Sequence, residues 1–331
     1  MAGRRQKKSG RRSYAWRYRG RIVVCVFVEV IIICALVIMI GWNKGVKEWF
    51  EQFEQPVLKE VDISGINSPN AILMQARGGK ILGEINGEAQ IYPASMTKIM
   101  TVILGIENFD DLDEKITLTD EMFAGLYEQD ATQAGFQPGE EVRVIDLLYG
   151  AMLPSGAECC IALADTISGS EADFAELMNK KARKLGMENT HFCDSTGLHN
   201  PDHYSTVKDI AVLMKYCIKN DTFREIVETS RHSTGVTNIH PDGITYYSTM
   251  FKNLSDPTVT GGKILGGKTG YTSEAGHCLV SFAEIEGREY IFVSAGASGA
   301  DGNTIPHIQD AVNVYNRVGA AIEAKMNDNN K

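Results

Sequence analysis

The chain has 331 residues, of which 44% are hydrophobic and 23% are charged, so it carries enough apolar surface for a folded core and is neither disordered nor collagen-like. Its net charge is −9, but nine of the 33 basic residues lie within residues 1–21, which contain no acidic residue. The remainder is therefore strongly acidic. This argues against nucleic-acid binding, because that binding depends on Lys and Arg side chains that neutralise phosphates.

Residues 22–42 form the first predicted element, a membrane span. They carry one charged side chain, Glu29, and a helix of this length reaches roughly 30 Å, the thickness of a bilayer core. A cleavable signal peptide has a shorter apolar region that ends in small residues, which is not the pattern here. Because the basic cluster lies on the N-terminal side, we expect a single-pass anchor in membrane lipid, with residues 1–21 in the cytoplasm and the rest outside the cell.

The cysteines that follow the span do not resemble a disulfide framework. They are odd in number and dispersed, and they show neither a CxxC pair nor a zinc-binding spacing. We therefore expect buried small hydrophobic side chains, without a metal or cofactor. These cysteines are Cys159, Cys160, Cys193, Cys217 and Cys278.

Residues 43–64 are expected to be a juxtamembrane linker, residues 65–326 one large domain and residues 327–331 a tail. The domain begins with a predicted hairpin, continues with helices and ends with strands and a last helix. Strands at both ends of the domain favour an α+β fold, an α/β sandwich in which the hairpin completes an antiparallel sheet flanked by helices. The predicted strands are 71–75, 80–85, 263–272, 277–285 and 289–296, and the predicted helices are 95–107, 144–152, 156–166, 170–185, 206–218 and 306–326.

Ser95 and Lys98 form an SxxK pattern at the predicted start of a helix. The spacing i, i+3 places a hydroxyl and an amine on one helical face, where a buried Lys with a lowered pKa can take the hydroxyl proton. The N-terminus of the helix also offers a backbone N–H to a developing oxyanion. The pattern alone is weak, since Ser205 and Lys208 repeat it; there Ser205 is predicted to be an ordinary N-cap.

Two further motifs distinguish the first copy. Ser155 precedes Gly156 in a break between helices, and Lys268, Thr269 and Gly270 lie within a predicted strand. A loop hydroxyl can relay a proton, a Lys–Thr pair can bind a carboxylate, and Gly270 lets a substrate backbone approach. Each motif alone could be a helix cap or a kink in an edge strand, but their joint occurrence in this order favours a catalytic site.

These motifs resemble the SxxK, SxN and KTG elements of the penicillin-binding serine peptidases. The longer strings are similar to the DacA-like D-alanyl-D-alanine carboxypeptidases of peptidase family S11, over about residues 66–315. The resemblance implies a beta-lactamase/transpeptidase-like fold. The strings are IYPASMTKIMT (91–101), LPSGAECCIALAD (153–165), LGMENTHFCDSTGLHNPDHYST (185–206) and GGKTGYTSEAGHCLV (266–280).

The resemblance implies a D-Ala-D-Ala carboxypeptidase that acts on peptidoglycan stem peptides and is inhibited by beta-lactams. Ser95 is then the acylated nucleophile, Lys98 its general base and Ser155 the proton relay. The backbone N–H groups of Ser95 and Tyr271 form the oxyanion hole. Because the sequence shows neither an outer-membrane-type signal nor a disulfide framework, we expect the protein to come from a Gram-positive cell. The implied substrate-binding residues are Lys268, Thr269, Gly270 and Tyr271.

The chain departs from the family pattern at three positions. Ala157 stands where SxN has Asn, Asp194 stands where many members have Asn, and Ser298 stands where some members place an Arg. Because Ala157 cannot donate a hydrogen bond from its side chain, a catalytically weakened penicillin-binding sensor remains an alternative. An endopeptidase that cuts cross-links also remains open, since it uses the same catalytic set.

Two other enzyme classes fit the sequence poorly. A class A beta-lactamase needs a Glu within an ExxLN pattern, which is missing between Ser155 and Lys268. A zinc D,D-peptidase needs several metal ligands, and His199 and His203 lie at i, i+4, but Pro201 between them argues against a helix that presents both.

Overall fold

The computed structural model describes residues 58–299 and 305–329. The predicted membrane span at 22–42 and the basic segment before it lie outside these residues. Within the described ranges, no helix combines the length and the apolar character that crossing a bilayer requires. The packed chain starts before residue 65, because Leu58, Val61 and Ile63 are buried in a core cluster.

A six-stranded sheet forms the middle layer, with the strand order β2-β1-β10-β9-β8-β7. All neighbouring strands are antiparallel. The N-terminal hairpin joins the C-terminal strands through β1 and β10, where Asn70 lies opposite Ala295. The strands are β1 (Asn70–Gln75), β2 (Ile81–Ile85), β7 (Thr258–Val259), β8 (Gly262–Thr272), β9 (Gly276–Ile285) and β10 (Arg288–Ala297).

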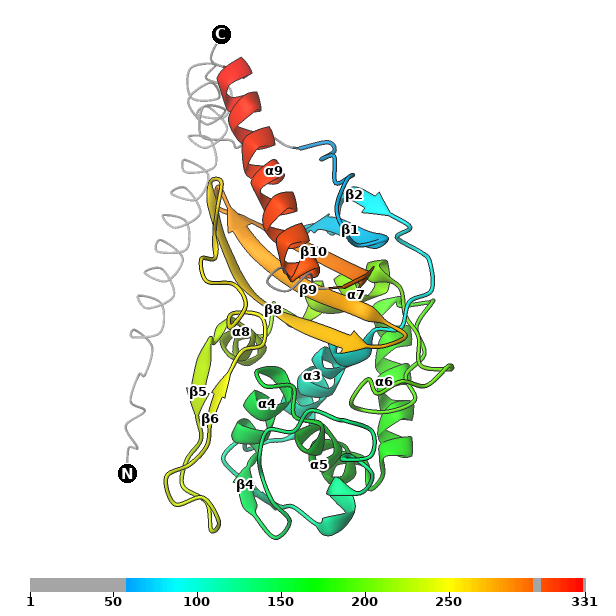
Figure 1. The fold of residues 1–331 in the computed structure, drawn as a ribbon, viewed down its shortest axis with the longest axis vertical. Helices are drawn as coiled ribbons and strands as arrows, with labels where there is room; N and C mark the ends of the chain where they lie inside the picture. Colours follow the sequence, from blue (N-terminus) through cyan, green and yellow to red (C-terminus); the bar gives the residue numbers. More distant parts are fainter. Residues whose placement is uncertain (1–57, 300–304, 330–331) are drawn as a thin grey trace, which may run out of the picture. The chain divides into compact units, whose positions relative to one another are not determined.

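The sheet is buried on both faces, and its strands divide their side chains between two core clusters. Along β10, Ile291 and Val293 face the larger cluster, whereas Tyr290 and Phe292 face the smaller one. This alternation is the period-2 pattern of a strand. The smaller cluster is covered by α9 (Pro306–Asn329), which packs against β9 and β10 (Figure 1).

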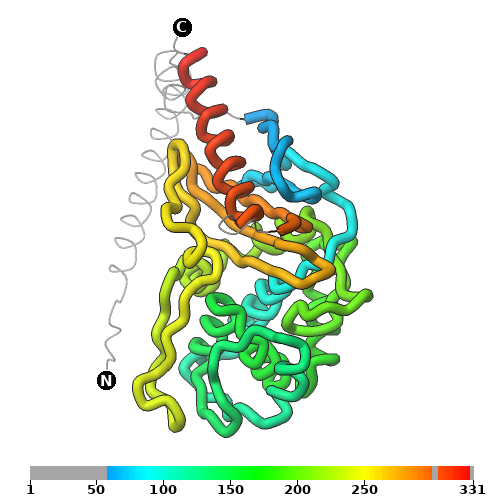
Figure 2. Tube along the Cα trace, in the orientation of Figure 1, coloured from blue at the N-terminus to red at the C-terminus, as the bar shows by residue number. Residues whose placement is uncertain are grey.

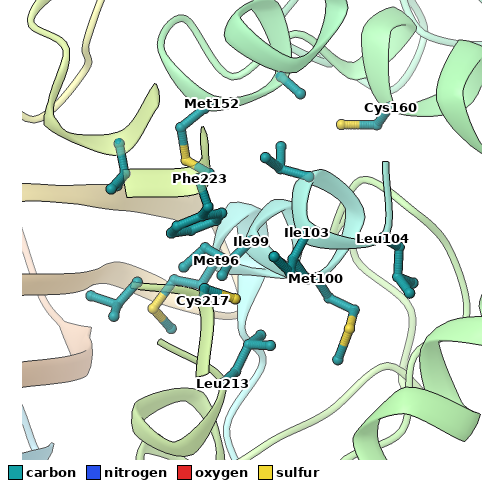
Figure 3. Packing of buried hydrophobic residues seen from close by; sticks show 14 of the residues in the cluster. Met96, Ile99, Met100, Ile103, Leu104, Met152, Cys160, Leu213, Cys217 and Phe223 are labelled. Carbon is teal, nitrogen blue, oxygen red and sulfur yellow. The ribbon is translucent and has the colours of Figure 1, made fainter. Parts of the chain in front are cut away.

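Helices cover the other face of the sheet. Helix α3 lies at their centre and is buried on all sides along its first eight residues; Figure 3 shows its side chains among those of Met152, Leu213 and Phe223. A helix that is apolar all round needs such a position. The helical segments on this side are η1 (Ala94–Thr97), α3 (Lys98–Asn108), η2 (Asp120–Phe123), α4 (Val144–Met152), α5 (Ala157–Ser168), α6 (Glu171–Leu185), α7 (Val207–Cys217) and α8 (Asp221–Glu228).

Two short two-stranded sheets accompany the helices. They are β3 (Lys115–Thr117) with β4 (Glu141–Arg143), and β5 (Arg231–Ser233) with β6 (Thr245–Tyr247). Asn238, in the loop between β5 and β6, donates to Gly139 O and accepts from the Glu141 backbone N–H. Figure 2 shows the β5–β6 segment, in yellow, beside the green segment that contains β4.

The prediction of an antiparallel sheet, completed by the N-terminal hairpin and flanked by helices, is confirmed. The helix predicted at 144–152 is α4, and the helix predicted at 170–185 is α6, which Ser170 caps by accepting a hydrogen bond from the Asp173 backbone N–H. The five cysteines that follow the predicted span are free thiols, and all but Cys193 are buried.

The helix predicted at 95–107 consists of the 3-10 turn η1 followed by α3, which starts at Lys98. One local prediction is wrong. Ser205 is not the cap of α7: Thr206 accepts the hydrogen bond from the Asp209 backbone N–H. Ser205 instead lies 2.8 Å from the Thr190 hydroxyl.

Asp310 ties α9 to the segment that leads into β1. Its buried carboxylate accepts hydrogen bonds from the backbone and side chain of Asn67, at 2.8 and 2.7 Å, and from the backbone and side chain of Ser68, at 2.9 and 2.6 Å. These contacts join residues more than 240 positions apart in the chain.

Asp310→Ala should lower the free energy of unfolding by about 3 kcal/mol, because the buried backbone and side-chain donors of Ser68 lose their charged acceptor. Urea unfolding of the full chain in mild detergent measures the change. Gln309→Ala, at the exposed neighbouring position, is the control and should stay within about 0.5 kcal/mol of the wild type. Equal stability of the two variants would contradict the role of Asp310.

Candidate active site

Ser95 and Lys98 meet at the turn where η1 passes into α3. In a 3-10 turn residues i and i+3 eclipse each other, so the two side chains leave the backbone on one side. Lys98 Nζ donates to Ser95 Oγ at 3.1 Å. Lys98 is buried and Ser95 is half-buried. Ala94, directly before Ser95, has φ 46°, a conformation that is costly for a residue with a Cβ.

Lys98 has a second partner that the sequence did not indicate. Its Nζ donates to the Thr196 carbonyl oxygen at 2.6 Å. The loop that carries Thr196 approaches η1 closely: a Cβ added to Gly197, which has φ 81°, would lie 1.9 Å from the Ala94 carbonyl oxygen. Only glycine fits this position.

Ser155 and Lys268 form a second hydroxyl–amine pair. Ser155 lies between α4 and α5 with φ 76°, and Lys268 reaches it from β8. Lys268 Nζ donates to Ser155 Oγ at 3.0 Å and to the Thr269 carbonyl oxygen at 2.8 Å. Burial, together with the charge of Lys98, lowers the pKa of Lys268 well below its usual value. Both acceptors are neutral oxygen atoms, and no carboxylate of the described residues forms an ion pair with Lys268.

The β8 strand brings these two pairs together. A Cβ added to Gly270 would lie 3.0 Å from the Ser95 backbone nitrogen, so β8 passes directly beside the turn of Ser95. Thr269 Oγ1 lies 2.7 Å from Thr249 Oγ1, and Tyr271 is 60% exposed. All seven residues predicted from the sequence therefore lie on β8 or on segments that contact it or one another.

One edge of β8 is open at this point. The neighbouring strand β7 pairs only with Gly262 and Lys263. Among the described residues, the stretch from Lys268 to Tyr271 pairs with a strand on its β9 side alone. Backbone groups on such an edge can accept an added strand.

Asp194 and His203 lie behind the Lys98 pair. His203 Nδ1 is 3.1 Å from Asp194 Oδ2, and its Nε2 is 2.9 Å from the Thr97 hydroxyl. Burial by itself raises the pKa of Asp194, but the hydrogen bond and charge of His203 and the bonds from the loop lower it to about 2. His199 instead contacts the Tyr92 ring edge-to-face.

His199 and His203 therefore have different partners, which removes the basis for a zinc site at this pair. In residues 58–299 and 305–329, no group of three His, Cys, Asp or Glu side chains could hold a metal ion.

The sequence missed Thr196, Thr97 and His203 as members of this site. They lie in strings that resemble the family. However, Thr196 contacts Lys98 through its backbone carbonyl, and Thr97 contacts His203 across 106 positions, so no spacing of residue types in the sequence predicts either contact. Asp194 was visible as a departure from the family pattern.

Comparison with known proteins agrees with this geometry. The profile of the family described as D-alanyl-D-alanine carboxypeptidase, peptidase S11, matches residues 57–299. The D-alanyl-D-alanine carboxypeptidase DacF of Bacillus subtilis is 35% identical over 231 residues, which cover 69% of this chain and 57% of that protein. DacC of Escherichia coli is 33% identical over 262 residues, which cover 72% and 58%.

A solved structure extends the likeness to three dimensions. A mutant of a Streptomyces DD-transpeptidase has a TM-score of 0.70 at 30% identity, covering 77% of this chain and 98% of that one. This chain spans 57–58% of the length of the two curated carboxypeptidases. From the match of the family profile to residues 57–299, this chain belongs to the D-alanyl-D-alanine carboxypeptidase family, peptidase S11.

Proposed function

We propose that the chain is a serine-type D-Ala-D-Ala carboxypeptidase, which removes the terminal D-Ala of peptidoglycan stem peptides through an acyl-enzyme on Ser95. One observation carries this proposal. Two buried lysines each hold a serine hydroxyl, at 3.1 Å for Lys98 and Ser95 and at 3.0 Å for Lys268 and Ser155, beside an open strand edge. A nucleophile with an adjacent amine base is the arrangement that acyl transfer requires.

In the first step, Ser95 Oγ attacks the carbonyl carbon of the penultimate D-Ala while Lys98 Nζ takes the hydroxyl proton. The backbone N–H groups of Ser95 and Tyr271 stabilise the oxyanion. The C–N bond then breaks, the departing D-Ala nitrogen receives a proton from the Ser155 hydroxyl, and the Lys98 ammonium reprotonates Ser155. Water hydrolyses the ester and restores Ser95.

Lys268 accounts for the selection of a carboxylate at the end of the substrate. Its ammonium is buried with neutral partners only, so an incoming carboxylate supplies the missing opposite charge. Thr269 adds a hydroxyl at the same place, and the open edge of β8 pairs with the extended peptide. The substrate is therefore a peptide with a free C-terminus. Beta-lactams, which carry a carboxylate next to a strained amide, acylate Ser95 in the same way.

Ser95→Ala should abolish both labelling by a fluorescent penicillin and D-Ala release from diacetyl-Lys-D-Ala-D-Ala, with a loss of at least about 1,000-fold. Gel fluorescence and an assay for free D-Ala measure the two activities on the full chain. Ser205→Ala is the matched control, because Ser205 belongs to the second SxxK pattern but is buried; it should retain labelling.

Labelling of the Ser95→Ala variant would contradict the nucleophile. Labelling of the wild type without D-Ala release would contradict a carboxypeptidase and favour an endopeptidase or the penicillin-binding sensor that Ala157 leaves open.

Lys268→Met should inactivate the enzyme and stabilise the fold. The folded state lowers the pKa of Lys268, so between that lowered pKa and the ordinary value near 10.4 the unfolded chain binds more protons, and stability rises with pH. The variant should therefore be more stable than wild type by about 1 kcal/mol at pH 7, with a difference that narrows toward pH 10.

Urea unfolding at pH 7 and pH 10 measures this effect. Lys180→Met, which replaces an exposed lysine on α6, is the control and should change stability by less than about 0.5 kcal/mol at either pH. The expected result is contradicted if the difference in unfolding free energy between Lys268→Met and wild type is smaller at pH 7 than at pH 10. In that case the wild-type chain does not bury an unpaired charge at position 268.

We also propose that residues 22–42 anchor the enzyme in the cell membrane, with the basic residues 1–21 in the cytoplasm and the catalytic domain, from about residue 65, facing the cell wall. The apolar composition of 22–42 and the one-sided basic cluster support this arrangement.

The full chain should remain with membranes after alkaline carbonate extraction, whereas a chain that starts at residue 43 should be released. Immunoblots of the pellet and supernatant measure the partition. Release of the full chain by carbonate would contradict the anchor.

A further inference from the structure

The loop of residues 194–203, here called the clamp loop, contacts the turn of the proposed nucleophile at three points. Thr101 Oγ1 donates to the Ser195 carbonyl oxygen at 2.6 Å, and Lys98 Nζ donates to that of Thr196 at 2.6 Å. Thr97 Oγ1 lies 2.9 Å from His203 Nε2. One of the three contacted groups is therefore the amine that takes the proton.

Asp194 fixes the peptide that carries the Thr196 carbonyl. Its Oδ1 accepts hydrogen bonds from the Thr196 backbone N–H at 2.8 Å, the Thr196 hydroxyl at 2.7 Å and the Gly197 backbone N–H at 2.7 Å. Its Oδ2 faces His203 Nδ1 at 3.1 Å, and the His203 side chain is 2% exposed. One carboxylate thus connects the Lys98 acceptor with the imidazole that holds Thr97.

The partners of His203 assign a proton to its Nδ1. Asp194 is ionised at neutral pH, since its pKa is about 2, and an ionised carboxylate oxygen accepts hydrogen bonds only. Nδ1 therefore donates to Asp194, while Nε2 and the Thr97 hydroxyl share the second hydrogen bond. The Cys193 backbone N–H also lies 3.3 Å from Nδ1, but the carboxylate is nearer and, as a charged partner, stronger.

We propose that Asp194 and His203 are positioning residues for the acylation of Ser95: together they hold the Thr196 carbonyl oxygen against Lys98 Nζ and tie the clamp loop to Thr97. This inference rests on the proposed function. As Lys98 takes the proton from Ser95 it becomes an ammonium ion, and a fixed carbonyl 2.6 Å away stabilises that charge. A displacement of about 1 Å in such a contact can lower a rate by up to about 100-fold.

The test follows acylation of the full chain by a fluorescent penicillin in stopped flow. The dependence on penicillin concentration separates the dissociation constant of the noncovalent complex from the first-order acylation rate constant. Asp194→Ala should lower the rate constant by about 10- to 100-fold and leave the dissociation constant within about threefold, because Lys268 and Thr269 are untouched. A general loss of folded protein lowers the labelled amplitude and does not produce this separation.

Asp194→Asn should restore the rate constant to within about threefold of wild type. The amide oxygen still accepts from Thr196 and Gly197, and the amide N–H can donate to Nδ1 of the other His203 tautomer. His203→Gln is an independent variant that loses the Asp194 contact, and it should lower the rate constant in the same way as Asp194→Ala.

Asp209→Ala is the matched control. Asp209 is also buried and also holds a backbone N–H and a threonine hydroxyl, those of Asn189 at 2.9 Å and Thr190 at 2.7 Å. It should destabilise the fold without lowering the acylation rate constant.

Three results would overturn the proposal. They are wild-type rate constants in both Asp194→Ala and His203→Gln, an equal loss in Asp209→Ala, or no recovery in Asp194→Asn. A wild-type chain that is not labelled at all would contradict the proposed function itself, and this inference with it, so the two failures are distinguishable.

Discussion

The placement of two buried lysine side chains beside one strand is the constraint on which the site depends. Lys98 is 3% exposed and Lys268 is 1% exposed, and none of the described carboxylates forms an ion pair with either. Their acceptors are two serine hydroxyls and the carbonyl oxygens of Thr196 and Thr269. Such burial costs free energy. Lys98 lies within hydrogen-bond distance of the hydroxyl whose proton it takes in the proposed reaction, and Lys268 gains an opposite charge when a substrate carboxylate binds.

The packing around α3 and the sheet keeps the two lysines in this arrangement. Apolar side chains of neighbouring helices surround α3, among them Met152 of α4, Leu213 of α7 and Phe223 of α8 (Figure 3). This packing fixes the first turn of the helix, where Lys98 lies. Ala94, directly before Ser95, and Ser155 itself both have positive φ values. Strain of this kind persists only where the surrounding structure fixes the chain, and two core clusters on either side of the sheet provide that support.

Periodic elements could be predicted from the sequence, and irregular ones could not. The strand that carries Lys268 and the helix at 144–152 follow their expected ranges, since apolar side chains repeat at the spacing of a strand or a helix. Ser95 and Lys268 could be predicted as site residues because they belong to the SxxK and KTG motifs. The clamp loop was not, because Thr196 contacts Lys98 across 98 positions through a backbone oxygen, which leaves no mark on residue type. The two-stranded sheets β3–β4 and β5–β6, at three residues a strand, were also missed because such short strands carry little periodicity. Helix α8 was missed although Phe223, Ile226 and Val227 are buried at the i, i+3, i+4 spacing of a helix.

Position 157 carries Ala where the family pattern has Asn, and other contacts fix the start of α5 in its place. The Ala157 backbone N–H donates to the Thr132 carbonyl oxygen at 2.8 Å. The next residue, Glu158, is fully buried and accepts from the backbone N–H groups of Ala134 and Gly135 at 2.6 and 2.9 Å. The start of α5, and with it Ser155, is thus fixed by the backbone and by Glu158. An amide at position 157 is not needed for that geometry, so the two serine–lysine pairs keep their places although the Ala157 side chain cannot form a hydrogen bond.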